Sequence, residues 1–321
     1  MKKPPTNLAA SVRQRLLTLS RTEKRDFQEV LTRFALERLL YRLGHTVYRD
    51  QFVLKGALLF LLWSTEIHRF TQDMDLLGYG EPAPEHWIAV FRAACQAEVQ
   101  DDGLVFEAET VAGRLIREED IYSGVRITLR ARLEQARIPM QVDIGLGDAV
   151  VPDPEEADFP PLLDFPAPHL RAYRRDTSIA EKVLALVTLG QDNSRMKDYF
   201  DIWLLARDYG FEAGPVSAAM KDVFVRRQVS LPEGIPIGLT AAFAEDASKR
   251  IQWKAFVRQR VVSPQPSLTL PEVTARMRDF LLPPLQALQT EQPFVGAWHP
   301  GGPWQTETQN EARLSLSSGD R

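Results

Sequence analysis

The sequence predicts an α+β fold, with a mixed sheet and helices in an N-terminal lobe and helices alone in a C-terminal lobe. Three observations predict it. Short apolar runs typical of strands occur before residue 150. Six prolines fall within residues 152–168, which indicates a long connection between the lobes. Beyond this connection, apolar residues recur at the three- and four-residue spacing of amphipathic helices.

The N-terminal lobe is expected to begin with helix and to continue mainly with strands. Leu, Val and Phe residues recur near helical spacing over residues 8–43, and Gly44 is a suitable stop. Two further helices are expected, a buried one at 57–63 and an amphipathic one at 85–99. Apolar runs with local alternation predict strands at 52–54, 74–77, 104–116, 124–133 and 140–144.

The C-terminal lobe is expected to be helical. Ser178 and Glu181 have the spacing of a capping box, which predicts a helix that begins there. Asn193 or Ser194 is expected to cap the next helix, which runs to Gly210. Further helices are expected at about 213–228, 239–258 and 270–290. We therefore divide the chain into residues 1–165, residues 166–290 and a disordered tail at 291–321, which is rich in Gly, Pro, Ser, Thr and Gln.

Composition excludes several classes of protein. The 321 residues are 44% hydrophobic and 26% charged, which is an ordinary globular mixture. No apolar run reaches the ~18 residues that a membrane span needs, so we expect no membrane association. The single cysteine, Cys95, excludes an internal disulfide framework and a multi-cysteine zinc site. The N-terminus has no apolar stretch typical of a secretory signal, and we expect a cytoplasmic protein.

Charge is distributed unevenly along a chain whose net charge is −4. Residues 1–45 hold ten basic and four acidic residues, whereas residues 148–164 hold six acidic residues and no basic one. The basic segment is either a solvated helix face, which is the commoner case, or a local surface that receives a polyanion.

Acidic residues suited to metal binding lie in two of the predicted strands. Asp73 and Asp75 are two residues apart, so their side chains share one face of the strand while Met74 points to the other. Two carboxylates this close repel each other unless a cation lies between them, and oxygen ligands suit Mg²⁺ or Mn²⁺. Asp143, flanked by apolar residues, is the best candidate for a third ligand. The alternative is that Asp73 caps a turn and Asp75 pairs with Arg69.

Lys55 and Gly56 directly precede the expected helix at 57–63. Glycine lets the backbone approach a ligand closely, and free amides at a helix start favour an anion. Lys55 beside it is suited to neutralise phosphate. The alternative for Gly56 is that it only allows tight packing between strand and helix.

Together these motifs resemble the AbiEii/AbiGii-type nucleotidyltransferase toxins, which are similar to the DNA-polymerase-β nucleotidyltransferase superfamily. The resemblance covers roughly residues 50–210 and rests on Lys55-Gly56-Ala57, Arg69-x-Thr71-x-Asp73-x-Asp75-Leu76, Val142-Asp143-Ile144-Gly145, Ala180-Glu181-Lys182 and Ser194-Arg195-Met196-Lys197-Asp198-Tyr199-x-Asp201. It implies a nucleotidyltransferase-like mixed sheet, an NTP substrate, Mg²⁺ or Mn²⁺, and an RNA acceptor such as tRNA. It also implies an AbiEi-type antitoxin, encoded nearby. One departure is that Ala57 stands where the wider superfamily has serine.

The resemblance also implies roles for single residues. Asp73 and Asp75 match the metal-binding pair, and Asp143 matches the third strand carboxylate. Lys182 matches the catalytic-site lysine of the toxins, and Asp198 the carboxylate on the following helix. The implied catalytic residues are therefore Asp73, Asp75, Lys182 and Asp198, and the implied nucleotide-binding residues are Lys55, Gly56, Arg69 and Lys182.

The surroundings of Lys182 independently suggest an anion site. Lys182 is expected in the first turn of its helix, where the helix dipole disfavours a cation by a few tenths to about 1 kcal/mol unless an anion binds. The alternative is that Glu181 neutralises it. Asp198 is expected to be partly buried and functional, with a local pair to Arg195 as the alternative, whereas Asp201 is expected to be structural.

The expected function is metal-dependent transfer of a nucleotide from an NTP to RNA, with release of pyrophosphate. The RNA phosphates would need cationic contacts, from the basic N-terminal segment or from Arg171, Arg174 and Arg175. Two alternatives stay open. One is another enzyme, either a nucleotidylyltransferase that acts on protein or a metal-dependent phosphodiesterase. The other is a non-catalytic module that binds NTP or RNA.

Overall fold

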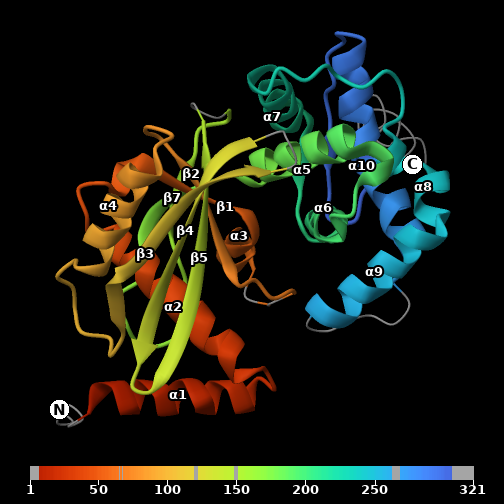
Figure 1. Cartoon of the computed structure of the whole chain (residues 1–321). Helices are drawn as coiled ribbons and strands as arrows, with labels where there is room; N and C mark the ends of the chain where they lie inside the picture. Colours follow the sequence, from red (N-terminus) through yellow and green to blue (C-terminus); the bar gives the residue numbers. More distant parts are fainter. Residues whose placement is uncertain are drawn as a thin grey trace, which may run out of the picture. The chain divides into compact units, whose positions relative to one another are not determined.

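The structure is a computed structural model of the chain and describes residues 7–64, 66, 68–118, 122–147, 151–261 and 268–305. The chain forms two compact units (Figure 1). Unit 1 comprises Met1–Ala149 and Pro154–Tyr173, and unit 2 comprises Val150–Asp153 and Arg174–Arg321. The main boundary thus follows residue 173, whereas the sequence predicted residue 165, because the chain still adds a strand to the N-terminal sheet after the prolines.

Unit 1 is built on a mixed sheet. Its strands within the described residues are β1 (Phe52–Lys55), β2 (Asp73–Gly78), β3 (Val105–Glu118), β4 (Tyr122–Leu133), β5 (Ala136–Leu146), β6 (Glu155–Asp158) and β7 (His169–Ala172). They lie in the order β3-β4-β5-β2-β1-β7-β6. β2 is parallel to β5 and β1 to β7, while the other neighbours are antiparallel. This confirms the predicted α+β class with a mixed sheet, although β6 and β7 were not predicted.

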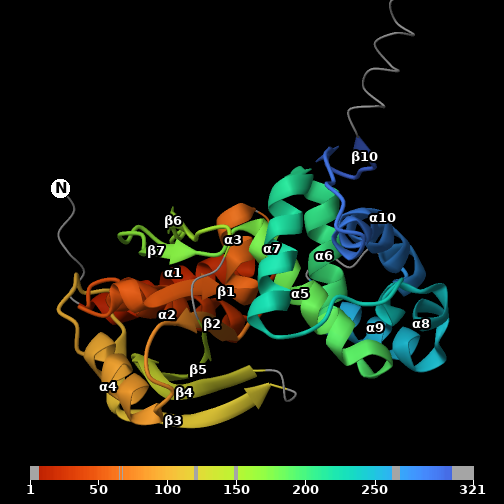
Figure 2. The same cartoon turned by 90° about the horizontal axis from the view of Figure 1, so that it is seen from above.

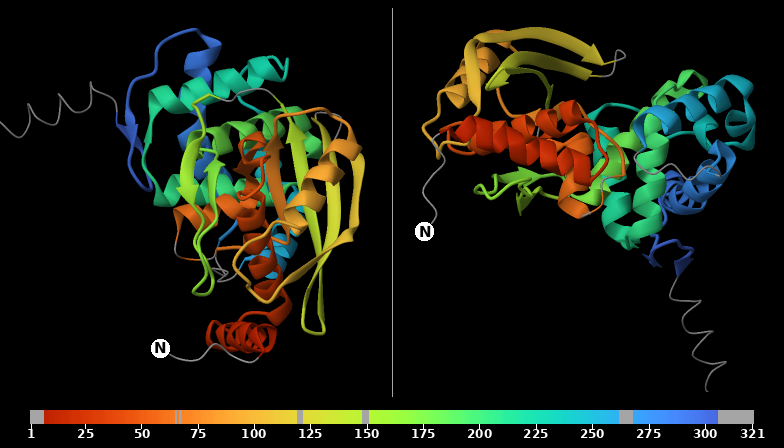
Figure 3. Two further views of the ribbon diagram at one scale, coloured as in Figure 1. Left: turned by 90° about the vertical axis from the view of Figure 1, so that its left-hand side faces the viewer. Right: turned by 90° about the horizontal axis from the view of Figure 1, so that it is seen from below.

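The sheet curves around one helix, α2 (Phe27–Leu43). Figures 2 and 3 show α2 between β3–β5 on one side and β6–β7 on the other. A second helix, α4 (Pro84–Cys95), packs Trp87 and Phe91 against Phe52 of β1, with ring centroids 5.3 and 6.0 Å apart. Because α2 is enclosed, most of its residues are buried, including charged ones.

The helical stretch expected at 8–43 is two helices, α1 (Leu8–Thr22) and α2. The break contains Lys24, whose φ of 53° is incompatible with a continuous helix. Asp26 then caps α2, since its carboxylate accepts the backbone N–H groups of Gln28 and Glu29. The helix expected at 57–63 is shorter than predicted: a 3₁₀ turn, η2 (Gly56–Leu58), leads into α3 (Leu59–Trp63).

Unit 2 is mainly helical. Its helices are α5 (Arg175–Leu189), α6 (Met196–Asp208), α7 (Ala213–Arg226), α8 (Ala241–Glu245), α9 (Ala247–Arg260) and α10 (Leu270–Gln289). The predicted caps of the first two are wrong. Ser178 lies inside α5, which begins three residues earlier. The N-cap residue of α6 is Arg195, and its backbone N–H donates a hydrogen bond of 2.8 Å to the side-chain oxygen of Asn193.

The segment at 291–305 is ordered, so the prediction of a disordered tail is wrong for these residues. The rest of the predicted tail, 306–321, lies outside the described residues. The ordered segment supplies β9 (Ala297–Trp298) and β10 (Trp304–Gln305) to a small sheet with β8 (Phe211–Glu212). Trp298 and Trp304 are buried, and their indole N–H groups bond to backbone carbonyls at 2.7 and 2.8 Å. The burial of these two tryptophans stabilises a segment whose composition otherwise favours disorder.

The remaining short elements are three 3₁₀ turns, η1 (Arg49–Gln51), η3 (Gly190–Asp192) and η4 (Ile237–Leu239). Within the part of the chain that the structure describes, no helix has both the length and the apolar character that crossing a membrane requires.

Candidate active site

Four charged residues form a row across neighbouring strands of the unit 1 sheet. The register pairs Lys55 with Asp75, Asp75 with Asp143, and Asp143 with Arg126. Residues paired in this way on adjacent strands point to the same face of a sheet. Asp73, two residues before Asp75, lies on that face as well. The sheet therefore brings all three strand carboxylates to one face and adds a cation at each end of the row.

The Asp75 carboxylate lies directly against Gly56. Gly56 has a φ of +71°, and a side chain at this position would collide with the Asp75 carboxylate. Glycine is thus required both by its left-handed backbone and by the close approach. The group that approaches Gly56 in this structure is the Asp75 carboxylate of the neighbouring strand.

Asp143 has a cationic partner that the sequence analysis missed. Arg126 donates two hydrogen bonds to it, one to each carboxylate oxygen and each 2.7 Å long. Gln141 adds a longer contact of 3.4 Å. This bidentate geometry is the strongest form of an arginine–carboxylate pair. Only the strand register brings Arg126 beside Asp143, so no local spacing could have revealed it.

The carboxylates of Asp73 and Asp75 are the ones most open to a cation. Asp73 is exposed and Asp75 partly exposed, while Asp143 is buried. Across the described ranges, no cluster of three His, Cys, Asp or Glu side chains has the geometry of a metal site. The structure therefore groups Asp73 with Asp75 as candidate ligands, and groups Asp143 with Arg126.

Lys55 extends over the same face of the sheet. A Cβ atom on Gly145 of β5 would lie 2.9 Å from the Lys55 amino group, so the glycine leaves room for this cation. An open hollow of about 770 Å³ begins at Asp73. Its walls carry hydrogen-bonding side chains, among them Gln28, Gln72, Gln141, Thr110 and Thr128. A substrate with polar edges therefore finds both space and partners beside the carboxylate pair.

Arg69 lies in a different pocket of unit 1. It lines this pocket together with Arg25, Arg33 and Phe60, and its guanidinium lies 6.0 Å from the Phe60 ring. Burial, and then the charge of Arg25, lower the pKa of Arg33 to about 10. The pocket thus gathers arginines, but the two Asp73–Asp75 carboxylates are not among its lining residues.

Lys182 is the centre of an ion cluster in unit 2. Its amino nitrogen lies 2.8 Å from Asp198 and 2.8 Å from Asp201, and Arg195 pairs with Asp198 at 2.9 Å. Both carboxylates are buried. Asp201, which was expected to be merely structural, therefore shares Lys182 with Asp198. Glu181, which the alternative made the partner of Lys182, pairs with Arg226 at 3.1 Å.

The electrostatics of this cluster differ from the prediction in one respect. Because α5 begins at Arg175, Lys182 lies beyond its first turn, and the predicted penalty from the helix dipole does not apply. Burial raises the pKa of Asp198, but the charges of Lys182, Arg195 and Lys197 outweigh burial and hold this pKa well below its ordinary value. The cluster therefore holds Lys182 between two buried carboxylates, of which Asp198 stays ionised.

The basic N-terminal segment is only partly available to a polyanion. Arg38 and Arg42 lie on the enclosed helix α2, and both are buried. They pair with the buried Asp102, Arg38 at 3.1 Å and Arg42 through two bonds of 2.5 and 3.0 Å. These charges form an interior network, which is neither the solvated face nor the polyanion surface that the sequence suggested.

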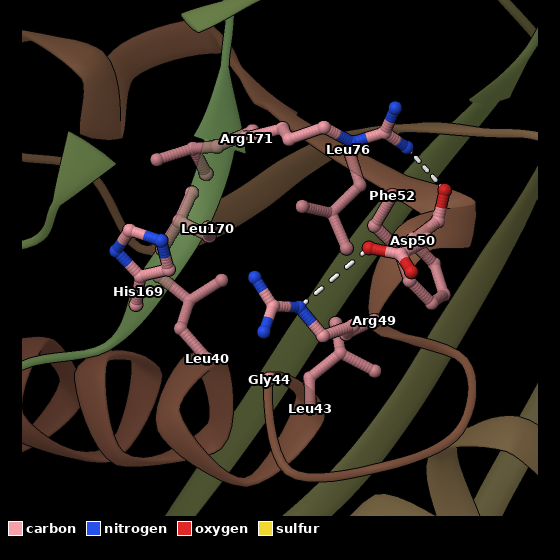
Figure 4. A pocket seen from close by; sticks show the side chains of 11 residues that line it. Leu40, Leu43, Gly44, Arg49, Asp50, Phe52, Leu76, His169, Leu170 and Arg171 are labelled. Carbon is pink, nitrogen blue, oxygen red and sulfur yellow. Dashed lines mark hydrogen bonds and ion pairs between the residues drawn. The ribbon is translucent and has the colours of Figure 1, made fainter. Parts of the chain in front are cut away.

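The three arginines expected near RNA are also engaged within the protein. Arg171 donates a hydrogen bond to the carbonyl of Asp50 in a pocket beside β1 (Figure 4). Arg174 lies 3.8 Å from Asp176. The guanidinium of Arg175 lies 4.2 Å from the ring centroid of Tyr209. Of these three arginines, only Arg174 is classed as exposed.

Comparison with known proteins identifies the family. The family described as "Nucleotidyl transferase AbiEii toxin, Type IV TA system" matches residues 38–280. No curated protein sequence matches the chain. The structure is similar to MenT4, nucleotidyltransferase toxin Rv2826c from Mycobacterium tuberculosis H37Rv, with 18% identity over 89% of this chain and 99% of that chain and a TM-score of 0.49. It is also similar to JHP933 from Helicobacter pylori, with 14% identity, 92% and 99% coverage, and a TM-score of 0.48.

The two structural similarities are too distant to carry an argument, so the assignment rests on the family match, which extends over well more than half of the chain. Members of this family are nucleotidyltransferases, which generally use an NTP and a divalent metal ion, and a type IV toxin–antitoxin system implies an antitoxin partner. The chain therefore belongs to the AbiEii family of nucleotidyltransferase toxins of type IV toxin–antitoxin systems.

Proposed function

We propose that this AbiEii-family enzyme transfers a nucleoside monophosphate from an NTP to the 3′ end of an RNA, with tRNA as the first candidate. The acceptor hydroxyl forms a bond to the α-phosphorus, the bond between the α- and β-phosphates breaks, and pyrophosphate leaves. The observation that supports this proposal most strongly is the pairing of Asp73 and Asp75 on one face of the sheet, beside Gly56 and next to an open hollow with several hydrogen-bonding side chains.

Asp73 and Asp75 fit a hard divalent cation, and we propose that they hold Mg²⁺ or Mn²⁺. Both offer oxygen ligands, both lie on the same face, and neither is buried. When bound, the ion would offset negative charge on the phosphoryl group that is transferred. Asp143 stays a candidate third ligand, but both of its oxygens are bonded to Arg126 in this structure. A role as ligand would require Asp143 to exchange one of these bonds.

The basic groups of the chain have separate roles in this proposal. Lys55 lies on the carboxylate face and would contact the phosphates of the NTP, with the Gly56 backbone nearby. Arg69, in its arginine-rich pocket, stays a candidate nucleotide contact. Lys182 would contact the nucleotide phosphates, because two contacts of 2.8 Å to Asp198 and Asp201 fix its amino group in advance.

Asp198 is proposed as a positioning residue for Lys182. Two roles are open to a carboxylate at this place, orienting the lysine or accepting a proton from the acceptor hydroxyl. A carboxylate whose pKa is held well below its ordinary value is a weak proton acceptor, which favours the orienting role. Its direct bond to the Lys182 amino group supports the same choice.

The proposed partner is an antitoxin of AbiEi type. The family implies an antitoxin, and the resemblance of the sequence motifs suggests this type. A small neighbouring gene that encodes a winged-helix protein would support it.

The proposal is tested by incubating the purified chain with each α-labelled NTP, Mg²⁺, bulk RNA and cell lysate. We expect label in RNA, and Asp75→Asn to reduce transfer on the order of 10³-fold because it removes one ligand charge. Asp164→Asn is the matched control in the same unit, since its side chain is 97% exposed. Label in protein instead of RNA would favour the protein-modifying alternative. NTP binding without pyrophosphate release would favour the non-catalytic module.

A further inference from the structure

A stripe of exposed cations runs along α9. Arg250, Lys254 and Arg258 follow one another at intervals of four residues, so they lie on one side of the helix, and all three are exposed. We call these three residues the basic stripe. α9 contains no acidic residue from its first residue to its last. This concentration of like charge stands out in a chain whose net charge is −4.

The basic stripe differs from the paired basic groups of unit 2. Lys182, Arg195 and Arg226 are held by carboxylates. Among the residues that the structure describes, no carboxylate forms an ion pair with any member of the stripe. Like charges four residues apart on a helix destabilise it. An arrangement that costs stability and is not neutralised within the described chain is suited to an anionic partner.

A neighbouring side of α9 is anchored to unit 2. Trp253 is buried, and its indole N–H donates to the carbonyl of Leu268 at 2.9 Å. Lys249 is also buried, and its amino group donates to the carbonyl of Asn193 at 3.0 Å. The helix is therefore fixed through one side, and the basic stripe occupies a side that remains exposed.

This anchoring connects the basic stripe to the Lys182 cluster. Lys249 bonds to Asn193, and the Asn193 side chain accepts the backbone N–H of Arg195 at 2.8 Å. Arg195 in turn pairs with Asp198, the partner of Lys182. The stripe thus begins one residue after Lys249, which contacts the loop that leads into α6, the helix of Asp198.

We propose that the basic stripe binds the phosphate backbone of the RNA acceptor, an inference that rests on the proposed function. Four residues of an α-helix rise about 6 Å, so the three cations are spaced evenly, like the phosphates along an extended strand. Arginine and lysine contacts to phosphates confer affinity without reading sequence. A regular row of cations on a helix that contains no acidic residue fits a polyphosphate strand better than an irregular protein surface.

The test compares two double variants of the full chain with the same change of charge. Arg250→Gln/Lys254→Gln alters the basic stripe, and Arg278→Gln/Lys221→Gln alters an exposed arginine and an exposed lysine elsewhere in unit 2. The dissociation constant for tRNA and for bulk RNA is measured at several salt concentrations, together with the KM for NTP and the KM for RNA.

We expect the stripe variant to bind RNA about tenfold more weakly and to lose about two units of the slope of log affinity against log salt, because two phosphate contacts are removed. Its KM for RNA should rise while its KM for NTP stays at the wild-type value. The control variant should match the wild type. In the wild type, ultraviolet cross-linking to RNA should label the peptide that contains 250–258.

Three results would overturn the inference. Equal RNA affinity in the two variants would show that the stripe is only a solvated face. Loss of antitoxin binding in the stripe variant, with RNA binding intact, would assign the surface to a protein partner. Wild-type RNA cross-links confined to other peptides would exclude the stripe directly. By contrast, a wild-type chain that binds and labels no RNA at all refutes the proposed function itself.

Discussion

The Asp73–Asp75 pair of the unit 1 sheet and the Asp198–Asp201 pair of the unit 2 helices differ in exposure and in their cationic contacts. Asp73 and Asp75 lie on a strand, at least partly exposed, and Asp75 is in register with Lys55 on the neighbouring strand. Asp198 and Asp201 are buried and contact a lysine at 2.8 Å each. We propose that the first pair binds a cation from solution, whereas the second pair already contacts a lysine of its own chain.

This difference distinguishes the proposed metal site of unit 1 from the proposed positioning site of unit 2. Carboxylates that are neutralised by their own chain serve to orient that cation, and removing it leaves buried charge behind. Carboxylates that are not fully neutralised remain available to an external ion. Asp143 belongs to neither group cleanly, because it shares the face of Asp75 but is bound by Arg126.

The largest expected effect on stability comes from removing the cation of unit 2. Lys182→Met leaves two buried carboxylates without their shared partner and should lower the free energy of unfolding by about 3–5 kcal/mol. Urea denaturation measures the loss. Adding Asp198→Asn removes one of the stranded charges and should restore part of it. A double variant no more stable than Lys182→Met would contradict the account of this cluster.

A smaller loss is expected from crowding the unit 1 site. Gly56→Ala combines a strained left-handed backbone with a collision against Asp75. Its matched control is Gly190→Ala, whose φ is also positive but around which nothing lies within 4 Å. We expect the control to cost about 1 kcal/mol and Gly56→Ala about 1–3 kcal/mol, with a loss of nucleotide transfer only for Gly56→Ala. Equal effects on transfer would show that Gly56 has no special relation to the site.

The smallest expected effect is on the pH dependence of stability. The pKa of Asp198 is held below its ordinary value in the folded protein by neighbouring cations, so its ionised form favours folding. This contribution is fully present above the unfolded pKa near 4 and is lost as pH falls below it. Asp198→Asn should therefore flatten the fall in thermal stability between about pH 5 and pH 3. An unchanged acid limb would mean that Asp198 is not the group responsible.

Some features that local spacing determines were predicted correctly from the sequence, whereas the caps of α5 and α6 were not. The alternation of Asp73 and Asp75 about Met74 follows from the two-residue period of a strand, and the structure has them on the predicted strand. The basic stripe of α9 was also visible as a four-residue spacing of cations, but composition over longer segments drew attention to residues 1–45 instead. Charge counted along the chain does not show which residues lie on an enclosed helix.

Features that depend on distant segments were not predictable. The bond between Arg126 and Asp143 depends on the register of β4 against β5. The burial of Arg38 depends on a sheet that curves around α2. Trp298 is ordered because it packs on elements far from it in sequence, with its N–H on Ala206. In each case the environment of the residue is set by a contact with a distant segment, and not by its local sequence.

The central claim, that unit 1 holds the divalent cation and unit 2 does not, is tested most directly by Mn²⁺ titration of the purified chain followed by electron paramagnetic resonance. Asp75→Asn should weaken Mn²⁺ binding on the order of 10- to 100-fold, and Asp198→Asn should leave it at the wild-type value. Thermal denaturation of each variant verifies that it is folded. Binding that survives Asp75→Asn, or that is lost in folded Asp198→Asn, would contradict the account.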